Sequence, residues 1–467
     1  MEGVDYEPKV KYKRTLSETS TTELFFKDFE EKKLNFSLCE TEVQEINSSV
    51  YEIVNRLLAK VSDHDNRFTF SEIIKLGSIA EGTKLIEPNE FDYLCVLKDF
   101  SNPDMVRCRK VCSHNPGHAH IFIEDKSLLR KWGSFMDEGQ LLANKMFAEI
   151  SSIANTIYMN MVKEQTKIKV DTSFGHLHFG GFSVTDGGPN TVFHMYWIPV
   201  KEGQKLDICV DVSPAIRYFG MEDISLSPVF ATKSAFQNLT SVLLVPGLLH
   251  KTVNKCMDKC FRISCTDIEV QLVKTLSEKH ISCYKILKYM ISYIGLDLSV
   301  SNLMYLPLSS FILKMAVILH AANCKDRLAK KKCMDDIVGV ILNCLMPNDR
   351  PKPFMPNIFL KEHNLLFKLE FIQQHDITAM NFLMHIQVLT GFKEFQRKLD
   401  EERPLHYNYD KCYELLKILV KRLEEVKGGI YRTFYAHYKA HGRWNFVNGS
   451  ARELVNLFEY PVPIFRQ

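Results

Sequence analysis

The sequence predicts an α+β fold of two lobes, with a mixed sheet in the first lobe, helices in the second and a cleft between them. Residues 165–212 alternate apolar and polar positions between Gly-rich turns, which is typical of a meander of strands. From about residue 266 onward helical periodicity dominates, in the segments 267–292, 307–322, 334–346, 379–398 and 408–440. A sheet-rich lobe joined to a helical lobe favours a functional site in the cleft between them.

The composition is that of a folded protein with little net charge. The chain has 467 residues, 46% of them hydrophobic, and its 59 Lys and Arg against 56 Asp and Glu give a net charge of +3. This excludes a disordered chain and a polycation, so any nucleic-acid contact must come from a local patch. No stretch approaches the roughly 20 apolar residues of a membrane span, and the polar N-terminus is unlike a signal peptide. The odd number of cysteines, 13, favours reduced thiols and a cytoplasmic location.

Four regions are expected along the chain. They are a flexible tail at 1–22, the sheet lobe at 23–260, the helical lobe at 261–375 and a C-terminal helical extension packed on it at 376–467. The first lobe opens with a long amphipathic helix, because apolar residues recur at helical spacing over 38–62. Three further elements are expected in this lobe: a short strand or helix entry at 69–76, a strand FDYLCVL within 84–97, and helix over 128–163.

Two carboxylates open the strand that contains FDYLCVL. Residues i and i+2 of a strand point to the same face, so Glu90 and Asp92 lie side by side while Phe91 faces the core. Paired carboxylates are unfavourable unless a cation lies between them, and Mg²⁺ prefers such hard oxygen ligands. Two harmless acids at a solvated strand end are the alternative interpretation.

A second acidic strand and a Gly-Ser turn extend this pattern. In residues 205–212 (KLDICVDV), Asp207, Cys209 and Asp211 share one face, and an Asp inside a strand is unfavourable unless it completes a site. Gly77-Ser78 follows a short apolar run, where it would let a phosphate approach the backbone, although a plain turn is the simpler interpretation. Three carboxylates on two adjacent strands beside such a turn suit two-metal phosphoryl or nucleotidyl transfer.

Several motifs, taken in order, resemble one family. They are GSIAEG at 77–82, PNEFD at 88–92, GGPN at 187–190, FRISCTDIE at 261–269, CYKILKYM at 283–290 and LSSFILK at 308–314. Over roughly residues 40–370 the chain resembles cyclic GMP–AMP synthase and its relatives in the male-abnormal-21 superfamily, the cyclic GMP–AMP synthase-like receptors. The resemblance implies a bilobal nucleotidyltransferase fold. It also implies an enzyme of innate immune signalling that makes a cyclic dinucleotide from two nucleoside triphosphates, such as ATP and GTP.

The resemblance gives a role to each matching residue. Glu90, Asp92 and Asp211 would be the catalytic ligands of two Mg²⁺ or Mn²⁺ ions, and Gly77 and Ser78 would hold a triphosphate. The other nucleotide-binding residues would be Arg262, Ser264, Thr266 and Glu269 at the bases, Lys288 and Ser310 at phosphate, and Phe311 stacked on a base. The family has a Tyr at this last position, so the stacking face is kept and the hydroxyl is lost.

The family's zinc ribbon is missing from this sequence. Residues 272–283 (LVKTLSEKHISC) hold one His and one Cys without an insert, so no structural zinc is expected. Two other groups of Cys and His lack the paired C-x₂-C spacing of a standard zinc site, which favours buried or loop residues without metal. The groups are Cys108, Cys112, His114, His118 and His120, and Cys256, Cys260, Cys265, His280 and Cys283.

The missing ribbon makes double-stranded RNA a better candidate activator than DNA. Arg56 and Lys60 in the long helix, Lys32 and Lys33 ahead of it and a basic run over 325–332 would supply sequence-independent, salt-sensitive phosphate contacts. Such charge runs are more often solvated faces. A ligand-induced dimer is a further expectation, and no membrane partner is expected. Two alternatives are a catalytically silent scaffold or nucleotide-binding protein of the same superfamily acting in development, and a less favoured polymerase that extends RNA ends.

Overall fold

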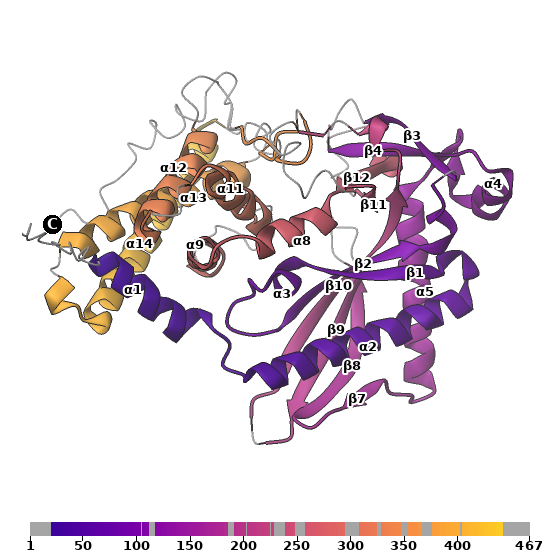
Figure 1. Ribbon diagram of the computed structural model, residues 1–467, viewed down its shortest axis with the longest axis horizontal. Helices are drawn as coiled ribbons and strands as arrows, with labels where there is room; N and C mark the ends of the chain where they lie inside the picture. The colour runs from indigo at the N-terminus through magenta and orange to yellow at the C-terminus, as the bar shows by residue number, and fades with distance from the viewer. Residues whose placement is uncertain are drawn as a thin grey trace, which may run out of the picture.

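The fold combines one large mixed sheet with a group of helices that lies beside it (Figure 1). The computed structural model describes residues 20–441 except 104, 112–116, 185–190, 202, 225, 228–238, 248–256, 295–307, 325–327, 347–353, 362, 367–375 and 402–403. Strands dominate the first half of the chain and helices the second, which confirms the α+β class that the sequence predicts. Each helix in the described part is too short or too polar to cross a lipid bilayer.

A single sheet of twelve strands forms the larger half, in the order β5-β6-β4-β12-β11-β10-β9-β8-β7, with β2 paired to β10, β1 to β2 and β3 to β4. The first six strands are β1 (Phe70–Leu76), β2 (Glu90–Leu97), β3 (Val106–Val111), β4 (His118–Ile123), β5 (Met136–Asp137) and β6 (Gln140–Leu141). The other six are β7 (Lys169–Asp171), β8 (Gly175–Val184), β9 (Thr191–Pro199), β10 (Leu206–Tyr218), β11 (Val242–Pro246) and β12 (Cys260–Ser264). The long strand β10 connects the parts of the sheet, because it pairs with three other strands, β2, β9 and β11.

Five helices come before or within the sheet-forming part of the chain. They are α1 (Thr21–Phe29), α2 (Glu40–His64), α3 (Gly77–Glu81), α4 (Lys126–Trp132) and α5 (Ala143–Lys163). The later helices are α8 (Thr266–Lys274), α9 (Glu278–Lys288), α11 (Ser310–Asn323), α12 (Lys330–Leu345), α13 (Asp376–Glu401) and α14 (Tyr409–His441). The prediction of helices in the second half of the chain is therefore confirmed.

The predicted amphipathic helix at 38–62 is α2. Its apolar residues recur every three or four positions, and the stripe they form packs on Phe91 of β2 and Trp197 of β9. Trp197 also donates from its indole Nε1 to Glu42 Oε1 at 3.0 Å, which fixes the start of α2 on the sheet. This packing holds β2, the strand with the paired carboxylates, from the side opposite α3 and α8 (Figure 1).

Some sequence predictions differ from the structure. The helix predicted over 128–163 is wrong in its middle, where the β5–β6 hairpin separates α4 from α5. The helix predicted over 267–292 breaks after Lys274, and α9 begins at Glu278. The predicted division between lobes at 260/261 falls inside β12, so the sheet extends past it. Strands β3, β4, β11 and β12 were not predicted, because short apolar runs of this kind fit helix and strand equally well.

The N-terminal helix α1 packs on the helical half, far along the chain. Phe25 lies 5.4 Å from Phe395 between ring centroids, and Phe26 lies 6.0 Å from Phe392. The hydroxyl of Thr22 donates to the carbonyl of Gln396 at 3.1 Å. Residues 21 and 22 of the tail predicted at 1–22 therefore belong to α1, and residues 1–19 lie outside the described part.

Candidate active site

Three carboxylates meet on one face of the sheet. Strands β2 and β10 run parallel, with Asp211 opposite Asp92 and Cys209 opposite Glu90. Opposite residues on neighbouring strands share a face, and so do Glu90 and Asp92, which are two positions apart on one strand. The fold therefore brings together the three acids that the sequence singles out. Asp207, four residues before Asp211 on the same face of β10, has a 79% exposed side chain and pairs with Lys205 at 2.8 Å.

Gly77 lies directly against this group. It is the first residue of α3, has a φ of +71° and sits so close to Asp92 that a Cβ built on it would be 1.9 Å from Asp92 Oδ2. Glycine is needed here for two reasons, because it tolerates the left-handed backbone and because it leaves room for the carboxylate. Ser78 follows at once, and its carbonyl accepts from the backbone N–H groups of Thr83 at 2.8 Å and Lys84 at 3.0 Å.

Replacing Gly77 with Ala should cost more stability than the same change at Gly82. Both glycines have a φ of +71°, but nothing lies within 4 Å of a Cβ at Gly82, so only backbone strain of about 1–2 kcal/mol applies there. At Gly77 the clash with Asp92 adds about 1–3 kcal/mol. Urea unfolding of the two variants measures the difference, and equal losses would contradict this account of Gly77.

The acids strongly perturb one another. Burial, followed by the negative charges of Glu90 and Asp211, raises the pKa of Asp92 to about 7. The pKa of Glu90 shifts in the opposite direction, because Lys84 Nζ lies 2.7 Å from Glu90 Oε2. Partial burial works against the charge of Glu90, yet Lys84 and then Lys288 outweigh it and lower its pKa. The ionised form of Asp92 is thus disfavoured in the absence of a cation, and a cation beside Asp92 and Asp211 would stabilise it.

Two lysines approach the carboxylates from different elements. Lys84 comes from the loop between α3 and β2, and its side chain is only 6% exposed. Lys288 ends α9, and burial together with the charge of Lys84 lowers its pKa to about 8, although Glu90 works in the opposite direction. The charge of Lys288 in turn works to lower the pKa of Glu90 and of Asp92, and a cationic group beside these acids is what a contact to a phosphate would require.

A buried ion network joins the sheet half to the helices. Lys314 Nζ of α11 lies 2.5 Å from Glu81 Oε1 of α3 and also pairs with Glu269 Oε1 of α8. Burial opposes the charge of Lys314, but Glu269 and Glu81 outweigh it and raise its pKa. Glu269, expected to assist base binding, is thus already engaged by Lys314. The network fixes α3, and with it Ser78, against α8 and α11.

The remaining predicted nucleotide-binding residues lie on β12, α8 and α11. Arg262 is exposed on β12, whereas Ser264 and Thr266 are buried and their hydroxyl oxygens lie 2.5 Å apart. Ser310 is exposed at the start of α11, and the ring of Phe311 lies 5.8 Å from Lys314 Nζ. Ser310 and Phe311 thus remain accessible to a ligand, whereas burial lowers the pKa of the Arg262 guanidinium even though the residue as a whole is exposed. The GGPN motif at 187–190 lies outside the described residues.

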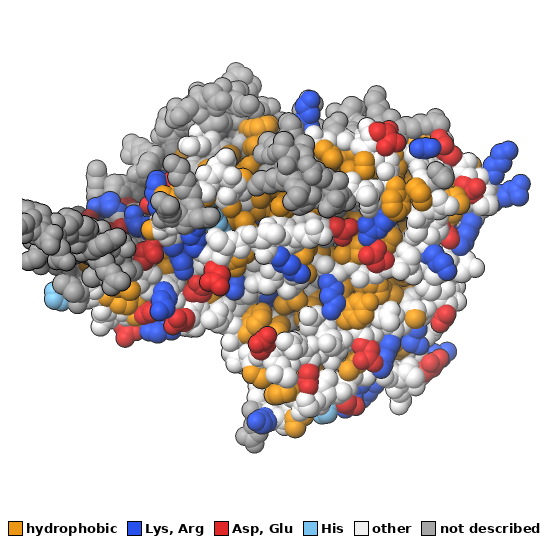
Figure 2. All heavy atoms as spheres, viewed as in Figure 1, with side chains coloured by type: hydrophobic (Ala, Val, Ile, Leu, Met, Phe, Trp, Pro, Cys, Tyr) orange, Lys and Arg blue, Asp and Glu red, His pale blue; other side chains and the backbone are white. Residues whose placement is uncertain are grey.

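The basic residues proposed for duplex binding are mostly paired with acids. Arg56 pairs with Glu52, and Lys32 lies 3.9 Å from Asp28 and 3.9 Å from the centre of the Tyr409 ring. The end of the predicted basic run belongs to the first turn of α12 and also pairs with acids: Lys330 with Glu30, Lys331 with Asp335 and Asp400, and Lys332 with Asp336. Lys325 and Arg327 lie outside the described residues. Figure 2 shows acidic and basic side chains interspersed over the face in view.

Among the described residues, the two groups of Cys and His suggested by the sequence do not form two separate clusters. Cys260 Sγ lies 3.4 Å from His120 Nε2, which joins one member of each group across β12 and β4. His280 instead lies beside His320, Cys324 and Cys333. Cys112, His114 and Cys256 lie outside the described residues.

Sequence reasoning missed three charged residues of this site, Glu81, Lys84 and Lys314. One signal was available for Lys314, because it is the single charge in the apolar run 311–319 and a buried lysine needs an acidic partner. No comparable signal marks Lys84, whose partner is set by how the loop folds. No family model matches this chain, and no curated protein matches it in sequence. The geometry of the carboxylates and lysines is therefore what bears on function.

Proposed function

We propose that this protein is a metal-dependent nucleotidyltransferase of the bilobal type, which joins two nucleoside triphosphates into a cyclic dinucleotide. The observation that carries the proposal is the parallel pairing of Asp92 with Asp211, beside Glu90 and against Gly77. Burial, together with the charges of Glu90 and Asp211, raises the pKa of Asp92 to about 7, and a bound cation would relieve this cost. Nucleotidyl transfer needs such a site next to a place for a triphosphate.

The donor set fits Mg²⁺ or Mn²⁺, because all three groups are carboxylate oxygens. Glu90, Asp92 and Asp211 would hold the ions. Bound there, two ions would supply activation of the attacking ribose hydroxyl and neutralisation of the leaving pyrophosphate. ATP and GTP are the proposed substrates.

The protein's own groups would bind and orient the nucleotides. Ser78, next to Gly77, and Lys288 flank the carboxylates from α3 and α9, where they would contact phosphate oxygens. Phe311 would offer an aromatic face to a base, and Arg262 a guanidinium. Lys84 would release Glu90 when a metal ion arrives, because one carboxylate oxygen cannot serve both partners equally.

We propose double-stranded RNA as the activator, ahead of DNA. Binding would be sequence-independent and salt-sensitive. The acid-paired state of Arg56, Lys32 and the first turn of α12 means that a duplex must compete with Glu52, Asp28 and the α12 carboxylates. The contact of one protein copy with a duplex should therefore be weak. Weak single contacts favour assembly of two protein copies on one duplex.

The proposal is tested by incubating the purified protein with labelled ATP, GTP, CTP and UTP, Mg²⁺ or Mn²⁺, and duplex RNA or DNA. Thin-layer chromatography should reveal a phosphatase-resistant product that depends on both metal and duplex RNA. Asp211→Asn should remove it, whereas Asp207→Asn, an exposed change on the same face of β10, should keep it. Absence of product with every duplex and metal, or primer extension in place of a small product, would contradict the proposal.

One observation favours a second candidate, a catalytically silent nucleotide-binding scaffold. The Lys84–Glu90 pair already neutralises one of the three acids without metal. A protein that no longer uses metal could keep this pair at no cost. Isothermal titration separates the two, since the enzyme should bind Mg²⁺ only together with nucleotide and lose this on Asp92→Asn, while the scaffold should bind nucleotide equally with EDTA present.

A further inference from the structure

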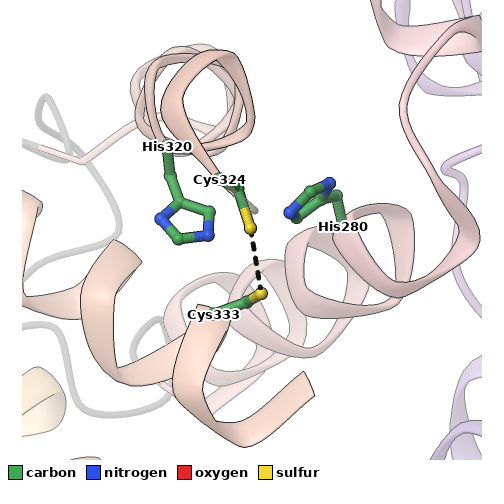
Figure 3. A group of neighbouring side chains, drawn as sticks. All are labelled: His280, His320, Cys324 and Cys333. Atoms are coloured by element: carbon green, nitrogen blue, oxygen red, sulfur yellow. Dashed lines mark hydrogen bonds between the residues drawn. The ribbon is translucent and has the colours of Figure 1, made fainter. Parts of the chain in front are cut away.

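A second group of metal-binding side chains lies among the helices, away from the carboxylates. His280 is on α9, His320 is on α11, Cys324 follows the end of α11 and Cys333 is in the first turn of α12. One donor atom from each lies within 4.8 Å of every other. Figure 3 shows the four side chains directed toward one another between the three helices.

The two sulfurs have the separation of a metal pair rather than of a disulfide. Cys324 Sγ and Cys333 Sγ lie 3.6 Å apart. A disulfide would hold them at about 2.05 Å. Two thiolates bound to one tetrahedral zinc at about 2.3 Å are separated by about 3.8 Å, which is close to the observed distance.

The histidines complete a tetrahedral set. Their rings are 5.4 Å apart between centroids and inclined at 75°, so they approach the sulfurs from different directions. Nδ1 of His280 lies 2.9 Å from Ser277 Oγ, and this hydrogen bond leaves Nε2 as the metal-facing donor. Within the described part of the chain, the buried Nε2 of His320 has no hydrogen-bond partner.

The surrounding contacts hold this arrangement together. Cys333 is fully buried, and His280 and His320 are 3% and 9% exposed. Lys279 Nζ donates to the carbonyl of Leu328 at 3.1 Å, which ties α9 to the segment that leads from Cys324 into α12. His320 and Cys324 are four residues apart, the spacing that puts two side chains on one face of a helix.

We propose that His280, His320, Cys324 and Cys333 form a structural zinc site that fastens α9, α11 and α12 together. Two thiolates and two imidazoles in a closed tetrahedral set are the donors that zinc prefers, and four protein ligands leave no open position for catalysis. Binding of one Zn²⁺ replaces the two thiol protons, which are released to solvent. The site replaces the sequence-based expectation that this chain holds no structural zinc.

The site bears on the candidate active site through two helices. Helix α9 carries Lys288, and α11 carries Phe311 and Lys314. Zinc would fix the relative position of these helices from the side remote from the carboxylates. The inference does not depend on nucleotide transfer, because the metal would stabilise a silent scaffold equally well.

The experiment measures metal in the full-length protein purified under reducing conditions. Mass spectrometry of the metal content should find about one zinc per chain after dialysis, as a closed four-ligand site retains its ion. Cys324→Ser should lose the zinc, and it is suited to the test because Cys324 is partly exposed and its loss leaves the core intact. Cys344→Ser, on α12 but outside the group, should retain it.

Titration of Co²⁺ into the wild-type protein provides a second measurement, which does not require a variant to fold. Co²⁺ added to metal-depleted wild-type protein should give thiolate-to-cobalt absorption and tetrahedral d–d bands that saturate at about one ion per chain. EDTA should lower the Tm of the wild type by about 5 °C or more and leave that of Cys324→Ser unchanged. A wild type without zinc and without cobalt bands, bands that survive Cys324→Ser, or a Cys324–Cys333 disulfide in the reduced preparation would overturn the proposal.

Discussion

Replacing Asp92 with Asn should abolish nucleotide transfer and at the same time stabilise the metal-free protein above pH 7. Activity should fall by about 10³-fold or more, because the lost ligand removes several kcal/mol of metal-dependent stabilisation. The gain in stability has the same origin. Burial of Asp92 and the nearby charges of Glu90 and Asp211 disfavour its ionised form. A neutral amide keeps the shape of the side chain and removes the repulsion.

The pH dependence follows from the direction of the shift. The pKa of Asp92 is about 7 in the folded protein, above its ordinary value of 3.8, so the folded state binds the proton more tightly. Wild-type stability therefore falls as pH rises from about 4 to 7, by up to about 4 kcal/mol at 1.36 kcal/mol per unit. Asp92→Asn should match the wild type near pH 4 and exceed it at pH 8.

Urea unfolding in EDTA at several pH values checks this result. Asp207→Asn is the matched control, because Asp207 lies on the same face of β10 but is 79% exposed. It should change stability by no more than about 0.5 kcal/mol at any pH. If Asp92→Asn and the wild type lose stability in parallel between pH 4 and 8, the three carboxylates do not interact as described.

Replacing Lys314 with Met should destabilise the fold by about 3–5 kcal/mol at neutral pH, because it leaves two buried carboxylates without their cation. The side chains of Glu81 and Glu269 are 1% and 15% exposed, so water cannot take the place of the ammonium group. Lys332→Met is the control, since Lys332 pairs with Asp336 at the surface of α12 and should contribute at most about 1 kcal/mol.

Recovery of stability in a triple variant would identify unpaired charge as the cause of the loss. Adding Glu81→Gln and Glu269→Gln to Lys314→Met should recover most of the loss, because neutral amides remove the unpaired charges. Chemical denaturation of the single and triple variants provides the numbers. A cost below 1 kcal/mol for Lys314→Met, or no recovery in the triple variant, would show that the network does not join α3 to α8 and α11.

The sequence was most informative where local periodicity and chemistry agree. Helix α2 and strands β2 and β7–β10 could be predicted, because their apolar residues repeat with the period of the element. The pairing of Asp211 with Asp92 required the register of β2 and β10, which the residues alone do not specify. Their shared face was expected only because both strands carry acids at alternate positions.

Long-range contacts account for what could not be predicted. Lys84 and Lys314 are charged residues whose burial depends on partners from other elements. Three ligands of the proposed zinc site lie on three helices and the fourth, Cys324, directly follows α11, so only the four-residue spacing of His320 and Cys324 is visible locally. Strands β11 and β12 are short apolar runs that become strands because β10 and β4 lie next to them.

The docking of α1 has a consequence for biosynthesis. Thr22 and its partner Gln396 are separated by 374 residues, so at about 5–20 residues per second Thr22 is synthesised roughly 20–75 s before Gln396 of α13. Until then Phe25 and Phe26 lack the α13 rings, Phe395 and Phe392, against which they pack. The nascent chain therefore carries unburied aromatic side chains of α1 until α13 is made, and a helix late in the described chain completes the burial of an early one.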